Sequence, residues 1–187
     1  MRLKMVSHRD ALAFVRERFG TEGQRQILAT LSDTDREVAV NQAELIHSWV
    51  DVDVHVRLLN AVLTELADNK EALLWEMGEW IATRQLNTIY RMFLFVVSPE
   101  FMLQRSSTVF HTFYDEGAME VERRSPGLVD CTFRGFAAAQ QPIELSITGW
   151  FAGAAKLSRA REVRLDITTS LREAKGYFRV GFSYRSG

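Results

Sequence analysis

The sequence predicts an α+β fold in which an N-terminal helical part packs with a C-terminal four-stranded antiparallel sheet. No proline occurs before Pro99, so long helices can run uninterrupted through the first half. Apolar residues recur there at helical spacing, whereas after Gly117 they alternate with polar residues, which is typical of half-buried strands. We therefore expect a single domain over residues 1–187, with a helical part at 1–115 and a sheet part at 116–187.

Apolar periodicity in the first half predicts helices at about 7–19, 24–31, 32–40, 51–67, 70–97 and 98–114. Ser7 and Asp10 have the spacing of a capping box for the first helix, and Gly20 stands where a left-handed helix end is expected. The last three patterns carry broad apolar stripes, more than one sheet and one helix would cover. We expect the surplus to be buried in a homodimer built on these helices.

The second half predicts the sheet and one helix. Two alternating segments around Val121 and Cys131, separated by turn-forming residues at 125–127, predict an antiparallel hairpin. A helix at 141–157 follows, then strands at 163–167 and 178–184. This strand, strand, helix, strand, strand order allows a sheet with that helix on one face and the earlier helices on the other. Trp150 falls on the helix's packing face, and Gly149 and Gly153 are expected to let the helix approach the sheet.

Composition excludes several function classes. Lys and Arg total 23 against 24 Asp and Glu, and no run of like charges occurs, so we expect no nucleic-acid partner. No window of 18 uncharged apolar residues predicts a membrane span, and the first residues lack the pattern of a signal peptide. Cys131 is the single cysteine, which excludes an internal disulfide and fits a cytoplasmic location.

Few residues have the spacing of a catalytic or metal site. His8, His47, His55 and His111 stand in separate predicted elements without a metal-ligand pattern, so we expect them to be structural or at the surface. Cys131 lies on the apolar side of its strand, where burial would suppress its reactivity. The sequence therefore predicts neither a cofactor nor a metal.

Aromatic residues gather in the segments between residues 75 and 114. A pocket that they line, with an arginine from the 70–97 helix, could hold a small apolar ligand that carries one anionic group. The candidate ligand-binding residues are Trp80, Arg84, Tyr90, Arg91, Phe110, His111 and Tyr114. The same residues could instead simply fill the core between helices and sheet.

Short segments in a fixed order resemble a known family. They are VRERFG (15–20), ILATLS (27–32), Trp49 ahead of VRLL (56–59), IYRMF (89–93), SPEF (98–101), GW (149–150) and AREV (160–163). Together they resemble a paralogous family of unknown function that is expanded in myxobacteria. That family is distantly similar to the heme nitric-oxide-binding (H-NOX) domain, the 4-vinyl reductase domain and the Bet3-type subunits of the TRAPP complex. The resemblance implies a ligand-binding fold of N-terminal helices on a four-stranded sheet.

The sequence departs from these relatives where they bind cofactors. The segment SPEF is similar to the one that follows the heme-ligand helix in nitric-oxide sensors, but residues 70–97 contain no histidine. The Tyr-x-Ser-x-Arg motif for heme propionates is replaced by EVERRS at 120–125. The late cysteines of domains like 4-vinyl reductase are replaced by Ser170, Glu173 and Lys175. We therefore expect neither a heme nor a metal site to carry over.

The leading functional hypothesis is a non-enzymatic sensory or adaptor domain in bacterial signalling that binds a small apolar ligand or a protein partner. One alternative is a metal-dependent or hydrolytic enzyme that uses His111 with Asp115 and Glu116. It predicts that these side chains converge in one cleft with perturbed pKa values. The other alternative is a purely structural dimerisation module, which predicts a filled interior and an apolar patch on one face.

Overall fold

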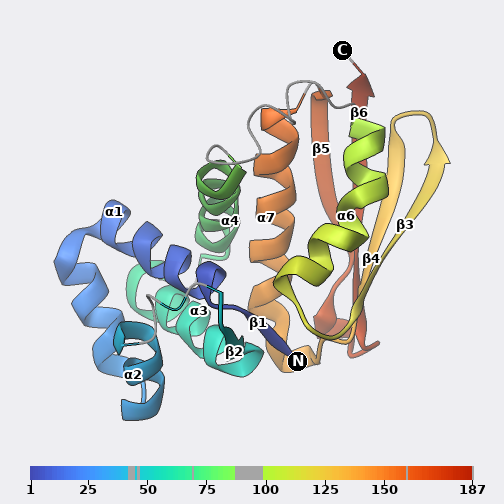
Figure 1. The fold of residues 1–187 in the computed structure, drawn as a ribbon. Helices are drawn as coiled ribbons and strands as arrows, with labels where there is room; N and C mark the ends of the chain where they lie inside the picture. Colours follow the sequence, from blue (N-terminus) through green and yellow to red (C-terminus); the bar gives the residue numbers. More distant parts are fainter. Residues whose placement is uncertain (42–44, 46, 69, 87–98, 159, 187) are drawn as a thin grey trace.

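The computed structural model describes residues 1–41, 45, 47–68, 70–86, 99–158 and 160–186. The N-terminal half consists of β1 (Arg2–Lys4), α1 (Met5–Thr30), α2 (Asp33–Asn41), β2 (Trp49–Asp51), α3 (Val52–Leu66), α4 (Ala72–Leu86) and α6 (Pro99–Phe113). The C-terminal half consists of β3 (Ala118–Ser125), β4 (Leu128–Arg134), η1 (Ala138–Gln140), α7 (Gln141–Leu157), β5 (Ala160–Thr169), η2 (Leu171–Glu173) and β6 (Tyr177–Ser186). The predicted fold class is confirmed, and Figure 1 shows the helical part beside the sheet part.

The start of the chain differs from the prediction. β1 pairs antiparallel with β2, with Leu3 opposite Val50, and no sequence pattern predicts this two-stranded sheet. Helix α1 begins at Met5, directly after β1, so the predicted capping box at Ser7 is wrong. The two predicted helices before residue 31 form one kinked element. The kink lies at Gly20, so the predicted interruption of the helix at this residue is confirmed. Its φ of 71° is a backbone conformation that favours glycine.

The predicted helix at 70–97 is described only in part. Helix α4 accounts for its first portion, and residues 87–98 lie outside the described ones. Among the helices described, none is both long and apolar enough to cross a membrane.

The large sheet has the strand order β3-β4-β6-β5, and each described pair is antiparallel. The predicted hairpin is confirmed, with Val121 opposite Cys131. Inward side chains of β4 and β6, among them Phe133 and Phe178, are fully buried and their rings stack with centroids 4.5 Å apart. The buried cluster that they belong to extends to residues of the helical part such as Leu59.

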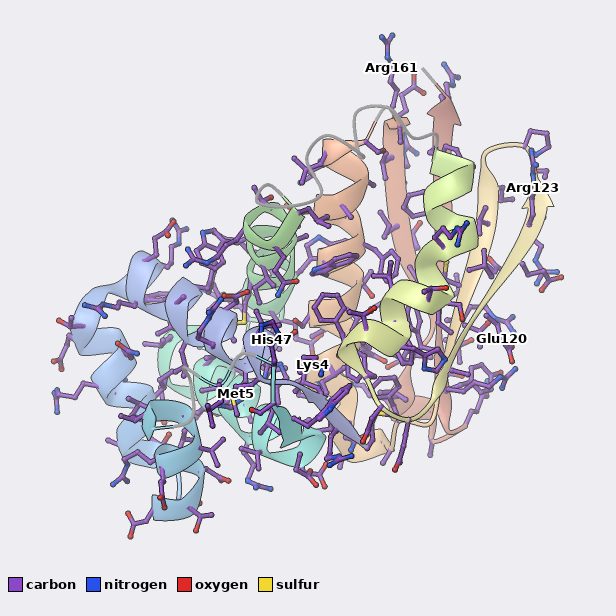
Figure 2. The ribbon with its side chains drawn as sticks, viewed as in Figure 1. Lys4, Met5, His47, Glu120, Arg123 and Arg161 are labelled. Atoms are coloured by element: carbon purple, nitrogen blue, oxygen red, sulfur yellow. The ribbon has the colours of Figure 1, made fainter. Side chains whose placement is uncertain are left out.

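Both long helices next to the sheet cover the same face. The ring of Phe133 contacts Phe110 of α6, with centroids 6.1 Å apart, and Phe151 of α7, at 5.7 Å. The expectation that the earlier helices cover the opposite face is therefore wrong for α6. That opposite face carries charged side chains such as Glu120, which projects from β3 (Figure 2) and pairs with Arg134. Charged alternate positions leave this face suited to water rather than to a helix.

The glycines of α7 serve a different contact from the predicted one. A Cβ on Gly149 would collide with the backbone oxygen of Trp75 in α4, and one on Gly153 would lie 2.7 Å from the Glu79 oxygen. Gly78 of α4 faces the backbone of α7 in the same way. The small residues thus bring α7 against α4 rather than against the sheet, because only residues without a side chain permit backbone contact between helices.

Candidate ligand cavity

A cavity of about 70 Å³ lies where the helical part meets α7. Its apolar walls come from β1, α4, α6 and α7, and they consist of Leu3, Ile81, Val109, Phe110, Phe113, Ile147 and Phe151. These side chains reach the same place because Leu3 of β1 forms a bridge with Tyr114, directly after α6, while α4 and α7 run side by side (Figure 1). The site is partly open and mostly apolar. It is also small, since pockets for drug-sized ligands measure roughly 300–1,000 Å³.

Five polar side chains also line this cavity: Ser7, His55, Tyr114, Ser146 and Trp150. The Tyr114 ring stacks on Phe110, with centroids 4.8 Å apart, and burial raises the pKa of its hydroxyl. Trp150 is half-buried and donates its indole hydrogen bond to Gln85 of α4, at 3.1 Å. A few polar atoms in an apolar enclosure are the usual means by which a pocket orients a ligand.

Two histidines that are 47 residues apart in sequence meet beside the cavity. His8 of α1 and His55 of α3 are 0% and 4% exposed, and their Nδ1 atoms lie 3.3 Å apart. Burial lowers the pKa of His8 to about 4 and holds the pKa of His55 well below its ordinary value. Both imidazoles are therefore neutral at pH 7, because a charged ring would be desolvated without compensation.

A chain of hydrogen bonds leads from the cavity wall to the surface. Gln85, which accepts from Trp150, donates to the Asp10 carboxylate at 2.9 Å. Asp10 is 1% exposed, and its other oxygen lies 3.0 Å from Arg9 and 3.5 Å from Arg84. Asp10 therefore belongs to a buried charge cluster rather than to a helix cap, and this cluster connects α1, α4 and α7.

The sequence-predicted site residues are only partly brought together. Phe110 and Tyr114 line the cavity. Trp80 and Arg84 lie beside the Asp10 cluster, where the Arg84 guanidinium is 5.3 Å from the Trp80 ring centroid and the Trp80 indole donates to Glu17. The side chain of His111 is exposed, and Tyr90 and Arg91 lie outside the described residues.

Sequence reasoning missed His8, His55 and the polar path through Gln85. A signal for the histidine pair was present, because each histidine stands at helical spacing within an apolar face. His8 precedes Leu12 by four residues, and His55 precedes Leu59 by four. Only the structure shows that these two faces meet.

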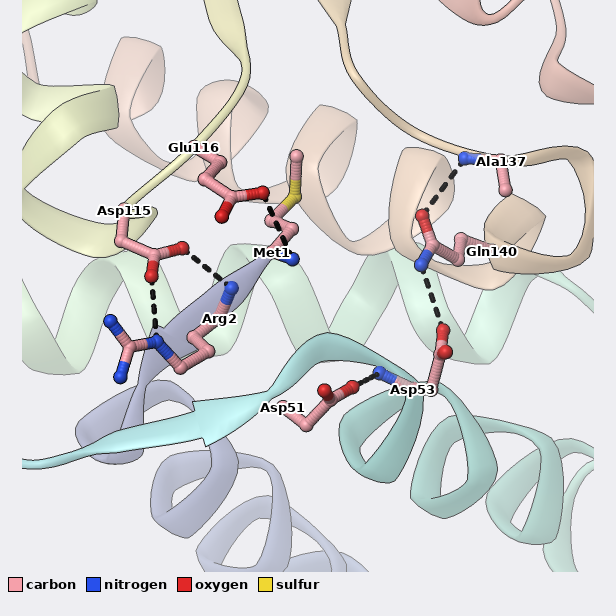
Figure 3. A network of polar contacts seen from close by, with 8 residues as sticks. All are labelled: Met1, Arg2, Asp51, Asp53, Asp115, Glu116, Ala137 and Gln140. Atoms are coloured by element: carbon pink, nitrogen blue, oxygen red, sulfur yellow. Dashed lines mark hydrogen bonds and ion pairs between the residues drawn. The ribbon is translucent and has the colours of Figure 1, made fainter.

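The acids near His111 have other partners. The Asp115 carboxylate accepts from the backbone nitrogen of Arg2 at 2.6 Å and from its side chain at 2.7 Å, and these bonds lower the pKa of Asp115. Glu116 pairs with the amino group of Met1 at 3.2 Å, so both acids are directed at β1 (Figure 3). Across the described residues, no group of three or more His, Cys, Asp or Glu side chains is placed to hold a metal. This geometry does not favour the enzyme alternative.

The arrangement of elements matches solved structures over nearly the whole chain. An Fe(II) unliganded H-NOX protein from K. algicida superimposes with a TM-score of 0.74 at 13% identity, covering 99% of this chain and 98% of the other. The fold is that of the H-NOX domain. An H-NOX protein from S. oneidensis gives a TM-score of 0.71 at 10% identity, with coverage of 98% and 99%. An oxygen-binding H-NOX domain related to soluble guanylate cyclases gives 0.65 at 11%, with coverage of 94% and 92%.

No family model and no curated protein matches the chain. The resemblance to the myxobacterial, 4-vinyl reductase and Bet3-type families therefore stays a prediction, while the likeness to H-NOX structures establishes the fold.

Two of the similar structures come from work on heme distortion and heme redox potential. We therefore asked whether the residues of this cavity fit a heme. The cavity of about 70 Å³ is far smaller than the roughly 300–1,000 Å³ that even drug-sized ligands need. It cannot widen between α4 and α7, because their backbones touch at Gly149 and Gly153. His55 offers a neutral ring nitrogen, but a donor without space for the macrocycle does not make a heme site. This cavity, as the described residues line it, does not fit a porphyrin.

Proposed function

We propose that this protein is a non-enzymatic sensory or adaptor domain in bacterial signalling that binds a small apolar ligand, without heme. One observation carries the proposal: a mostly apolar, partly open cavity lies at the junction of β1, α1, α3, α4, α6 and α7. A ligand there would contact elements of both halves. Cytoplasmic location is part of the proposal, supported by the single, buried Cys131, whose pKa burial raises to about 12.

The proposal includes a route by which ligand binding could be communicated. Trp150 lines the cavity and is connected through Gln85 to Asp10 on α1. A ligand that shifts the indole changes the partners of a buried carboxylate, and buried charge clusters respond strongly to such changes. The readout would be a shift of α1 relative to α4, available to a protein partner.

Xenon is a suitable probe of the cavity because it is apolar and has no hydrogen-bonding groups. We expect xenon to shift the NMR signals of the Ile81 and Ile147 methyl groups and to change Trp150 fluorescence. Val109→Phe should narrow the cavity, since Val109 lines it and is 36% exposed, so its backbone need not move. The matched control is Val121→Phe, at a 37% exposed valine of β3 outside the cavity. Absence of xenon binding in the wild type would refute the proposal.

We also propose a homodimer. The apolar stripe of α3 is used within the chain, since Val52, Leu58, Leu59 and Val62 are at most 1% exposed. Within the described residues the exposed large apolar side chains are Val40, Leu45, Val109, Val121 and Leu128, which are scattered over several elements. Sedimentation at micromolar concentration tests the dimer, and a monomeric mass that persists on concentration would exclude it.

A further inference from the structure

We propose that His55 presents its Nε2–H group to the cavity, so that the ligand is a neutral compound of about three or four non-hydrogen atoms with one carbonyl oxygen, such as a short ketone or aldehyde. This inference rests on the proposed function, because it assigns the chemistry of the ligand that the cavity would take. It follows from the histidine pair, the electrostatics of the cavity walls and the cavity volume.

The first step concerns the proton shared by the two rings. Each neutral imidazole has one N–H donor and one bare nitrogen acceptor. The Nδ1 atoms of His8 and His55 are 3.3 Å apart, so one of them is protonated and the other is bare. The two rings must therefore be opposite tautomers. One ring has its proton on Nδ1 and a bare Nε2, and the other ring has a bare Nδ1 and its proton on Nε2.

The second step decides which ring has which proton. The Nε2 of His8 is buried with no hydrogen-bond partner, the one such side-chain atom among the described residues. An unpaired buried acceptor is better tolerated than an unpaired buried N–H. His8 is therefore protonated on Nδ1 and donates to His55. His55 is then protonated on Nε2.

The third step places that proton. His55 lines the cavity, while its Nδ1 is directed at His8. Its Nε2 has no hydrogen bond to any described residue, yet it is not among the atoms sealed from open space. The open space next to it is the cavity. A ligand oxygen there would satisfy an N–H donor for which the described residues offer no acceptor.

The last step excludes charged ligands and sets the size. The described residues that line the cavity include no Lys, Arg, Asp or Glu, so a charged group would lose its hydration without a counter-ion. A cavity of roughly 150 Å³ holds benzene, with six carbon atoms. The volume of about 70 Å³ here therefore suits a molecule of about three or four non-hydrogen atoms.

Acetone and 2-methylpropene form a matched pair of probes, because they have nearly the same shape and differ by a carbonyl oxygen in place of a methylene group. We expect both to bind the wild-type protein in NMR titrations. His55→Phe should weaken acetone binding about tenfold, which is the worth of one hydrogen bond, and should change 2-methylpropene binding less than threefold. Tyr114→Phe tests the competing hydroxyl of the cavity wall. Tyr177→Phe is the control, since it removes a hydroxyl outside the cavity and retains the ring, and it should leave both affinities unchanged.

The outcomes separate this inference from the proposed function. If His55→Phe weakens both probes equally, or if Tyr114→Phe is the variant that loses acetone, the hydrogen bond from His55 is refuted and the ligand cavity stands. If neither probe nor xenon binds the wild type, the cavity proposal is refuted as well.

A measurement on the wild-type protein covers the case in which His55→Phe does not fold. Long-range ¹H–¹⁵N NMR spectra distinguish protonated from bare ring nitrogens. We expect a proton on Nδ1 of His8 and on Nε2 of His55, and acetone should shift the His55 Nε2–H signal. The opposite pair of tautomers would overturn the inference.

Discussion

Helices α4 and α7 are in backbone contact along one stretch, and next to it they help to enclose the cavity. At the contact, Gly149 and Gly153 leave no room for even a methyl group. At the cavity, Ile81 and Ile147 occupy the same two helices, and the opposite walls come from other elements. The comparison shows that the glycines set the distance between these two helices. Next to the contact, the branched side chains of Ile81 and Ile147 do not fill the space at that distance, and the cavity results.

The largest effect is expected where the contact has no freedom to adjust. Gly149→Ala places a Cβ against the backbone oxygen of Trp75, so the helices must separate, and we expect a loss of about 4 kcal/mol in unfolding free energy. Gly176→Ala is the matched control. Nothing lies within 4 Å of its added Cβ, and only its φ of +73° costs energy, about 1 kcal/mol. Equal losses in urea denaturation would contradict the steric account.

The second prediction concerns the histidine side of the cavity and its response to acid. The pKa of His8 is about 4 when folded and near 6.5 when unfolded, so the unfolded chain binds a proton that the folded chain does not. The contribution of neutral His8 to the unfolding free energy is thus complete above about pH 6.5 and is lost as the pH falls towards 4. His8 alone contributes about 3 kcal/mol over this range. The lowered pKa of His55 acts in the same direction.

Urea denaturation at several pH values between 7 and 4.5 measures this slope. A double variant, His8→Phe with His55→Phe, should have a much flatter profile over the same range, since phenylalanine does not titrate. The ion pair of Asp35 with Arg57 adds little to the pH dependence of stability in this range. The pKa of Asp35 is near 4 in the unfolded chain and lower in the folded protein, so this carboxylate titrates mainly below pH 4.5. An equally steep profile in the double variant would assign the acid sensitivity to other groups.

The sheet part could be predicted from the sequence more completely than the helical part. Alternation in a strand specifies both its existence and its buried face, so the hairpin of the segments around Val121 and Cys131 followed from pattern and turn chemistry, and the structure supplies its register. Helical periodicity specifies a buried face but not its partner. For this reason the glycines of α7 were assigned to the sheet, although they contact α4.

The cavity itself was only half predictable for the same reason. The aromatic pattern placed Phe110 and Tyr114 in a pocket, and both line the cavity. His55 supplies the most distinctive polar group, but in the sequence it is a single histidine on an apolar helix face, which is typical of a structural residue. Its pairing with His8 depends on a crossing of α1 and α3 that no local pattern encodes.

Trp150→Ala tests the residue of α7 that lines the cavity and also bonds to Gln85 of α4. The sequence predicts a fully packed tryptophan, whereas the structure has it half-buried, with its ring 6.1 Å from Phe113 and its indole bonded to Gln85. We therefore expect a loss of about 2 kcal/mol in unfolding free energy, less than for a fully buried tryptophan. Trp150→Phe should recover the packing but not the hydrogen bond, and should lose about half as much. An unchanged melting temperature in the alanine variant would make Trp150 a surface residue.

Arg84→Ala tests the periphery of the Asp10 cluster. Arg84 is 51% exposed and contacts Asp10 and the Trp80 ring, while Asp10 keeps Arg9 and Gln85 as partners. We expect a loss below about 1 kcal/mol, because solvent screens a half-exposed ion pair. Xenon binding should be unchanged, since Arg84 does not line the cavity. A loss of xenon binding would show that the cavity and the cluster are more tightly coupled than the contacts indicate.

Hemin should produce the smallest response, with no stoichiometric binding. Axial ligation needs a suitable side chain facing a space that accommodates the macrocycle. His55 satisfies the first condition only, because the glycine contact fixes α4 against α7 and leaves about 70 Å³ between the surrounding elements. Hemin titration should therefore give a broad Soret band that gel filtration removes.

Gly149→Ala, which forces the helices apart, is the informative comparison. If this variant gained a sharp, saturable Soret band, the helix contact would be what excludes the porphyrin. A sharp one-to-one complex of the wild-type protein that survives gel filtration would instead contradict the fit argument.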